Sequence, residues 1–254
     1  MIKAIILYFQ FFTAIPLPIA IDEPETRFRE GIVWFSLAAF LYSLIIGVSF
    51  GFLRMFFSVA TSLVILAFVD VALTNGFHFD ALADMADGIF SGQNKERMLE
   101  IMKDSRVGSN GLLALIFYFL FYIFVGSDLI TQFDTLPEEV GFMISLYLTG
   151  RGAMSYSFHN FKYHSHSKRG LGAILTGIST RKIILAQIII GALIGVFSGI
   201  SGVVAFILVL GLTEVYRRLI FRKIGGFNGD TTGAVCLLAQ IAYLLLMTVL
   251  LRLL

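Results

Sequence analysis

Residues 76–106 read GFHFDALADMADGIFSGQNKERMLEIMKDSR, a polar stretch inside an otherwise apolar chain. It opens with Asp80, Asp84 and Asp87, spaced i, i+4 and i+7. In an α-helix, which turns roughly 100° per residue, this spacing places three carboxylates within about 60° on one face. Carboxylates this close repel one another unless a cation lies between them, and Mg²⁺ is usually held by one or two carboxylates together with substrate phosphates. The spacing therefore predicts a magnesium site, with a solvated acidic helix face as the alternative.

The rest of the chain has the composition of a membrane protein. Of its 254 residues, 57% are hydrophobic and 14% are charged, whereas about a quarter of a soluble domain is charged. Mean hydropathy is +0.87. Ionisable groups are costly inside a membrane and are candidates for functional roles there, which favours the metal site over the solvated face. The composition predicts an all-α, polytopic integral membrane helical bundle that forms one domain over residues 1–254.

We expect about seven membrane spans, because a spanning helix needs about 20 apolar residues. Residues 4–21 are apolar but contain Pro16 and Pro18, which predicts either a thin span or a short re-entrant or interfacial segment. Residues 94–104 read NKERMLEIMKD, which predicts a short amphipathic helix capped by Asn94. The expected spans cover residues 31–52, 55–75, 111–127, 140–158, 183–200, 202–221 and 233–251.

Lysines and arginines concentrate in alternate connections between these spans. The segments 22–30, 76–110, 159–182 and 217–232 are rich in them, whereas the intervening connections hold Arg54 and otherwise acids. Cytoplasmic loops of membrane proteins carry the excess of basic residues. We therefore predict a multi-pass protein of the cell inner membrane. Its active site should face the cytoplasm, because the polar motifs all lie on the basic side.

Two Gly-rich turns lie on this same side, and each precedes an expected span. The first, DSRVGSNG at residues 104–111, has the composition of a phosphate cradle at a helix N-terminus, with Arg106 beside small and hydroxyl residues. The alternative is an ordinary turn. The second, GGFNGDTTG at residues 225–233, holds Asp230 and Thr231, which either bind a ligand or cap the next helix.

Other ionisable residues also have two interpretations. The basic run over residues 217–223 is either an anchor at the lipid headgroups or a clamp for an anionic substrate. His78 is a ligand, a proton relay or an interfacial residue. Asp70 and Arg151 lie within expected spans, where they form either a buried ion pair or a part of the catalytic site.

Together these features predict a polar pocket suited to phosphoryl transfer, whose catalysis relies on positioning and on charge neutralisation by metal and arginine. A cation transporter could use the same acids but would not need the Gly-rich turns. We expect Asp80, Asp84 and Asp87 to be the catalytic residues, and to bind the metal together with Asp104. The residues expected to contact substrate are His78, Ser105, Arg106, Gly108, Arg151, Asp230 and Thr231.

Three blocks of the sequence resemble the signature of the cobalamin synthase family, the adenosylcobinamide-GDP ribazoletransferases. The resemblance starts near the N-terminus at FFTAIPLP, so it covers nearly the whole chain. This first segment lacks the arginine of the family pattern, because Ala14 follows Thr13. The blocks are GFHFDALADMADGIFSG at 76–92, EIMKDSRVGSNG at 100–111 and GDTTGA at 229–234.

The resemblance implies a transferase of vitamin B12 assembly. A hydroxyl of α-ribazole, or of its 5′-phosphate, attacks the diphosphate of adenosylcobinamide-GDP, and GMP leaves as adenosylcobalamin or its 5′-phosphate forms. The implied cofactor is Mg²⁺, and the implied partners are the corrinoid nucleotide, α-ribazole and membrane lipid, with no nucleic acid. Other corrinoid-assembly enzymes or a second copy of the chain are further candidate partners. The alternatives are a CDP-alcohol-type membrane phosphotransferase and an ion-coupled transporter.

Overall fold

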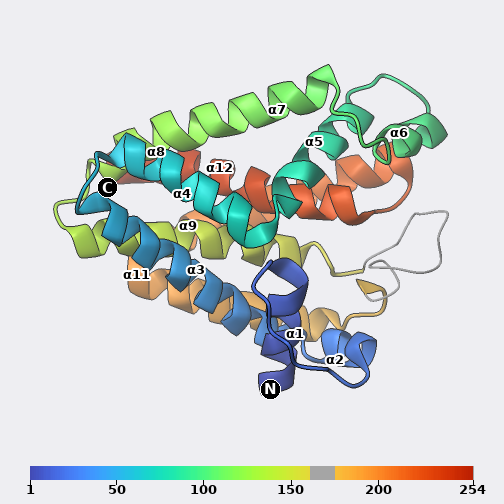
Figure 1. Cartoon of the computed structure of the whole chain (residues 1–254), viewed down its shortest axis with the longest axis horizontal. Coiled ribbons are helices and arrows are strands. Elements are labelled where there is room, and N and C mark those ends of the chain that lie inside the picture. The colour runs from blue at the N-terminus through green and yellow to red at the C-terminus, as the bar shows by residue number, and fades with distance from the viewer. Residues whose placement is uncertain (161–174, 254) are drawn as a thin grey trace.

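The computed structural model describes residues 1–160 and 175–253, and its regular structure over those residues is entirely helical (Figure 1). The all-α prediction is therefore confirmed. Residues 161–174 of the basic segment 159–182 lie outside the described part of the chain. In chain order the helices are α1 (Ile2–Phe12), α2 (Pro24–Glu30), α3 (Ile32–Arg54), α4 (Val59–Thr74), α5 (Phe77–Ile89), α6 (Lys95–Ile101), α7 (Ser109–Leu120), the π-helix η1 (Phe121–Val125), α8 (Gly126–Ile130), α9 (Leu136–Tyr156), α11 (Thr180–Ile224) and α12 (Gly229–Leu253).

Helix α9 forms the centre of the bundle, packed against α3, α11 and α12 (Figure 1). Every residue from Gly141 to Ser155 is buried. At the start of the helix, Glu138 accepts the N–H of Thr135 at 3.0 Å, as the acid of a capping box does. Arg54, the last residue of α3, pairs with Glu139 of α9 at 2.7 Å. Helix α9 is thus held at its charged start and covered along its length.

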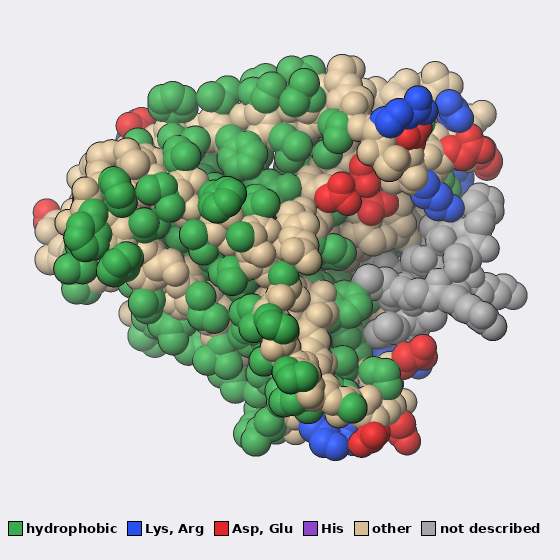
Figure 2. All heavy atoms as spheres, in the orientation of Figure 1, with side chains coloured by type: hydrophobic (Ala, Val, Ile, Leu, Met, Phe, Trp, Pro, Cys, Tyr) green, Lys and Arg blue, Asp and Glu red, His purple; other side chains and the backbone are tan. Residues whose placement is uncertain are grey.

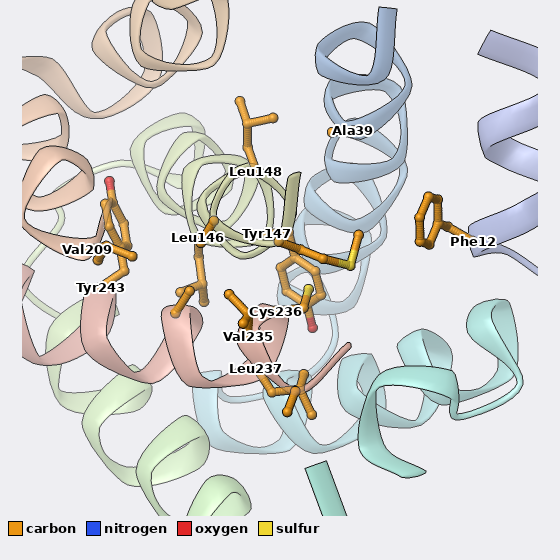
Figure 3. Close-up of a cluster of buried hydrophobic side chains, with 14 of the residues drawn as sticks. Phe12, Ala39, Leu146, Tyr147, Leu148, Val209, Val235, Cys236, Leu237 and Tyr243 are labelled. Atoms are coloured by element: carbon orange, nitrogen blue, oxygen red, sulfur yellow. The ribbon is translucent and has the colours of Figure 1, made fainter. Parts of the chain in front are cut away.

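Glycines let the neighbouring helices approach α9 closely. A Cβ on Gly47 of α3 would lie 2.5 Å from Ile144 Cγ1, and one on Gly150 of α9 would lie 2.7 Å from the Cys236 carbonyl oxygen of α12. Small residues at helix crossings allow membrane helices to gain van der Waals contact, which drives their association. Around these crossings lies a continuous apolar cluster, whose labelled side chains come from α1, α3, α9, α11 and α12 (Figure 3).

Helix α11 is broken at Gly199, where φ of 61° and ψ of −160° leave the helical region. Its two arms run back along each other, because a Cβ on Gly202 would lie 3.1 Å from Ile194 Cγ2. In a straight helix, eight residues would separate these positions by about 12 Å. The structure thus divides this region where the sequence predicted, between residues 183–200 and 202–221.

Four helices of the described residues are long and apolar enough to cross a membrane: α3, the continuous helix Ser109–Ile130, α11 and α12. The bent pair α4–α5 gives five if it forms one span. The predicted count of about seven also included α9 and both arms of α11, and it stays a prediction. Apolar side chains cover most of the face shown in Figure 2, as expected of a surface in contact with lipid. The protein is a multi-pass membrane protein.

The N-terminal segment contains a helix too short to cross a bilayer. Helix α1 has 11 residues, or about 16 Å of length against a hydrocarbon core of about 30 Å. It ends before Pro16 and Pro18 and packs against α2 and α3, where the Tyr8 hydroxyl donates to the Phe28 carbonyl at 2.6 Å. Its length favours the interfacial or re-entrant alternative over the thin span.

The polar motifs gather at one end of the bundle. Helices α5 and α6 lie there, together with the beginnings of α7 and α12 (right side of Figure 1). Lys223 of α11 donates to the carbonyl of Ile89 at the end of α5, at 3.1 Å. The Asn228 amide, just before α12, donates to Met102 Sδ after α6, at 3.3 Å. Segments far apart in the sequence therefore build one polar end.

We predict that Gly47→Leu destabilises the protein, because the added side chain must displace Ile144 at the α3–α9 crossing. Overpacking of this kind costs about 1–3 kcal/mol, which should lower the thermal midpoint in detergent by roughly 2–12 °C. Gly211→Leu is the matched control, because a Cβ there meets no atom within 4 Å. Equal midpoints for the two variants would contradict the close crossing.

Candidate active site

A sharp bend at the end of α4 sets the direction of the acidic helix α5. Asn75 and Gly76 both have left-handed backbones, with φ of 51° and 68°. The N–H groups of both donate to the Val71 carbonyl, which closes α4 as asparagine and glycine commonly close helices. Helix α5 then leaves at 92° to α4 and packs against α7 and α12.

The three acids of α5 lie on one helix, as predicted, but their surroundings differ. Asp80 is exposed, Asp84 is half-buried and Asp87 is buried. The carboxyl group of Asp84 is close enough to Asp80, Asp87 and Asp230 to be repelled by all three. Figure 2 shows acidic side chains gathered near the polar end of this face. A cation between α5 and α12 would relieve this repulsion.

Asp230 reaches the acids of α5 because α12 and α5 cross closely. A Cβ on Gly233 would lie 2.7 Å from Ala81 Cβ, so only glycine allows the two backbones this approach. Asp230 lies in the first turn of α12, where the positive end of the helix dipole favours a carboxylate. Asp230, which was predicted to contact substrate, therefore lies beside the acids of α5.

The residue that caps α12 is Asn228, which corrects the expectation that Asp230 or Thr231 could be the cap. Asn228 Oδ1 accepts the N–H of Thr231 at 2.8 Å, and its amide donates to Asp230 Oδ2 at 3.2 Å. The Thr231 hydroxyl accepts the Asn228 N–H at 3.0 Å and is fully buried. Thr231 thus supports the turn, while Asp230 is left half-exposed at the site.

Asp87 joins the acidic helix to the start of α7. Its two carboxylate oxygens accept the N–H of Gly108 at 2.7 Å and the N–H of Gly111 at 2.8 Å. A Cβ on Gly108 would lie 2.5 Å from Asp87 Oδ1, so the turn can close only around glycine. The N-terminus of a helix favours an anion, and here Asp87 supplies it. The phosphate-binding role of Gly108 and the metal-binding role of Asp87 stay predictions.

Asp104 and Arg106 pair with each other in the connection between α6 and α7. The guanidinium of Arg106 donates to both carboxylate oxygens of Asp104, at 2.6 and 2.9 Å. These bonds lower the pKa of the Asp104 carboxyl from 3.8 to about 2. Arg106 and the neighbouring Ser105 are exposed. Their predicted contacts with phosphate, and the predicted metal contact of Asp104, stay predictions.

Arg151 lies in a buried polar group below the site. Its guanidinium is 3.9 Å from Asp70 and 3.5 Å above the ring of Tyr42, and the Tyr42 hydroxyl donates to Asp70. The buried ion pair predicted for Asp70 and Arg151 is therefore present, and the predicted contact of Arg151 with substrate stays a prediction. His78, the neighbouring substrate-contact candidate on α5, is also buried.

The acids at this end have the chemistry of ligands for a metal ion whose coordination shell is completed by water and substrate phosphate. Within residues 1–160 and 175–253, no group of three or more His, Cys, Asp or Glu side chains could hold a metal by itself. Carboxylates of Asp80, Asp84 and Asp230 are nevertheless the hard oxygen donors that Mg²⁺ prefers, and it needs only one or two of them beside water and phosphate. Mg²⁺ therefore stays a prediction, with these carboxylates as its candidate ligands.

Sequence reasoning missed two residues that shape the site. Asn228 had a signal, because an asparagine three residues before a free helical N–H is a common N-cap. The role of Gly111 had no sequence signal, because its partner Asp87 lies 24 residues away. The predicted helix capped by Asn94 is confirmed as α6, with Asn94 Oδ1 accepting the Arg97 N–H at 3.0 Å.

Comparisons with known proteins agree on one family. The family model described as Cobalamin-5-phosphate synthase matches residues 4–248. A protein of Listeria monocytogenes serovar 1/2a named adenosylcobinamide-GDP ribazoletransferase is 39% identical over 91% of this chain and 92% of its own. Proteins of the same name from Clostridium novyi and Caldanaerobacter subterraneus are 34% and 33% identical, each over more than nine-tenths of both chains. No solved structure matches.

We predict that Asp87→Asn loosens the start of α7, because an amide can accept only one of the two N–H bonds. The lost bond to a charged group should cost about 1.5–3 kcal/mol. Hydrogen exchange at the amides of Gly108 and Gly111 should accelerate in detergent or nanodiscs. Asp80→Asn, on the exposed part of α5, should leave their exchange unchanged, and equal protection in both variants would contradict the role of Asp87.

Proposed function

The chain belongs to the cobalamin-5-phosphate synthase family, and we propose that it joins adenosylcobinamide-GDP to α-ribazole or α-ribazole 5′-phosphate with release of GMP. The observation that carries this proposal is the family match over residues 4–248, which includes every polar motif at the acidic end. The relatives named adenosylcobinamide-GDP ribazoletransferase cover the same length.

The proposed reaction is a phosphoryl transfer between two oxygens. A hydroxyl oxygen of the ribazole forms a bond to the phosphorus that carries the cobinamide, and the bond from that phosphorus to the GMP oxygen breaks. The hydroxyl proton passes to a base. Catalysis of this type needs little covalent chemistry from the protein and depends on positioning and on stabilisation of charge.

We assign the metal and the base to the acids shared by α5 and α12. Asp80 and Asp230, which lie close enough to repel each other, would hold Mg²⁺ together with substrate phosphate, and the bound ion would neutralise the developing charge on the phosphoryl oxygens. Asp84 is our candidate base, because it is half-buried and lies nearest the centre of the acidic group. Asp87, by holding the amides of Gly108 and Gly111, would keep α5 and α7 in place.

We further propose that the acidic end faces the cytoplasm across the cell inner membrane. Lysines and arginines are concentrated in the connections at this end, and the positive-inside rule supports this orientation. The substrates are polar nucleotides, for which a site at the end of the bundle needs no passage through the membrane. Lipid then covers the exposed apolar side chains of α3, α4, α7 and α11.

The proposed function predicts GMP release when protein, adenosylcobinamide-GDP, α-ribazole 5′-phosphate and Mg²⁺ are combined. Asp84→Asn should lower the turnover number by about 10²–10⁴-fold, as loss of a general base does, while thermal stability stays within about 1 kcal/mol. Asp128→Asn, an exposed acid on α8, is the control and should turn over normally. No GMP from the unaltered protein would contradict the function, and normal turnover by Asp84→Asn would contradict the site.

The proposed orientation predicts one-sided labelling of two introduced cysteines. Asn94 is exposed at the acidic end and Asp134 is exposed at the opposite end, so the test uses Asn94→Cys and Asp134→Cys. In intact cells a membrane-impermeant maleimide should label only Asp134→Cys, and inside-out vesicles should reverse the result. The native Cys236 is fully buried and should give little background. Labelling of Asn94→Cys from outside would contradict the orientation.

A further inference from the structure

A second polar pocket opens beside the acidic end, and the proposed function leaves it without a role. It has a volume of about 320 Å³ and lies between the end of α9, the second arm of α11 and the turn before α12. We call it the basic pocket, and among the residues that line it are His159, Glu214, Arg217, Arg218, Arg222 and Phe227. Its volume lies within the range of about 300–1,000 Å³ typical of small-molecule sites.

One face of α11 supplies the charges of the basic pocket. Arg217 and Arg218 lie three and four residues after Glu214, and Arg222 lies four residues after Arg218, which places them on one side of the helix. Glu214 pairs with Arg217 at 2.7 Å and with Arg218 at 2.9 Å. Three arginines thus face a single acid, and the pocket keeps a positive excess.

Arg217 is a buried arginine of the basic pocket. It donates to the carbonyl and to Nε2 of His159, and burial lowers the pKa of His159 so that its neutral ring can accept this bond. Arg217 is 7% exposed, yet its Nε makes no hydrogen bond in the described part of the chain. A buried guanidinium N–H without an acceptor is costly, and an anion in the pocket would supply one.

Arg222 is an exposed arginine of the basic pocket. No hydrogen bond or ion pair is formed by its guanidinium among residues 1–160 and 175–253. A planar guanidinium can bind a phosphate through two parallel N–H bonds, which an ammonium cannot do. A basic residue that served only as a lipid anchor would need no pocket behind it.

Phe227 connects the basic pocket to the acidic site. Its ring lies 5.3 Å from the Arg217 guanidinium carbon, and it precedes Asn228, whose amide holds Asp230. Phe227 is itself buried, at 4% exposed, so a planar base in the pocket would stack on an arginine plane. The wall of the pocket is therefore part of the same turn that places Asp230 among the acids of α5.

We propose that the basic pocket binds the phosphate and planar base of a nucleotide-like substrate, with Arg222 and the Nε of Arg217 on the phosphate and the exposed Arg218 against the base. This rests on the proposed function, which supplies two such ligands: α-ribazole 5′-phosphate and the guanosine end of adenosylcobinamide-GDP. In either case the pocket holds one end of a substrate while its reacting atoms lie at the acids, so its residues position rather than react.

The variant that tests this is Arg222→Gln, because Arg222 is exposed and its loss should not disturb folding. The loss of a charge-assisted bond should raise the KM of one substrate about ten- to a hundredfold with little change in kcat. If the pocket holds the acceptor, the KM of α-ribazole 5′-phosphate rises and that of α-ribazole does not. If it holds the donor, the KM of adenosylcobinamide-GDP rises and inhibition by GMP weakens. Either result supports the proposal.

Arg222→Lys and Arg181→Gln complete the series. Arg222→Lys keeps the positive charge but cannot form two parallel N–H bonds to a phosphate, so it should recover only part of the lost affinity. Arg181 is exposed at the start of α11 and outside the pocket, so its variant should behave as the unaltered protein. Unchanged KM values and GMP inhibition in Arg222→Gln would overturn the proposal while leaving the proposed function intact.

A direct binding measurement tests the basic pocket independently of catalytic turnover. In EDTA, calorimetry with GMP and with α-ribazole 5′-phosphate should show one of them binding the unaltered protein and binding Arg222→Gln about tenfold or more weakly. This holds even if no GMP is released in the assay, so failure of the proposed function would be seen separately. Equal binding by both proteins, or a variant that differs only in retention of phosphatidylglycerol, would overturn the proposal.

Discussion

The bend between α4 and α5 is the constraint on which the site depends. Two successive left-handed residues, Asn75 and Gly76, end one helix and start the next at 92°. Without that turn, the acids of α5 would continue along the bundle among apolar neighbours, where ionised carboxylates are costly. With it, α5 crosses α12 at Gly233 and Asp84 comes close to Asp230. Backbone conformation at two residues thus decides whether the acids can form a common site.

Three acids at helical spacing need not do the same chemistry. The spacing predicts one face, but Asp87, near the C-terminal end of α5, accepts two amides of the α7 N-terminus. A carboxylate placed there is stabilised by hydrogen bonds and by the helix dipole. Asp80 and Asp84 remain more open, opposite Asp230 on another helix. The face therefore divides into a structural part and a part suited to metal and substrate, and the fourth acid comes from a segment about 140 residues further along.

Local features were predictable from the sequence, and contacts between distant segments were not. Apolar runs predicted the helices, Gly199 lies where two spans were expected to separate, and Asn94 caps α6 as predicted. The pairing of Asp104 with Arg106 and the engagement of Asp87 by glycine amides depend on how α5, α6 and α7 pack. A charge pattern shows which residues can bind a metal or a phosphate. In the folded protein, however, many of these polar groups form hydrogen bonds with one another.

The buried ion pair explains why the bend occurs where it does. Asp70 lies one turn before the end of α4 and is held by Tyr42 of α3 and Arg151 of α9, while the Thr74 hydroxyl donates to its carbonyl at 2.7 Å. Removing one partner of a buried pair typically costs about 3–5 kcal/mol, because the other charge is left unpaired. This cost opposes any slide of α4 along α3, against which it packs. The last turn of α4 is thereby fixed to α3 and α9 through Asp70, and the left-handed turn that follows directs α5 toward α12.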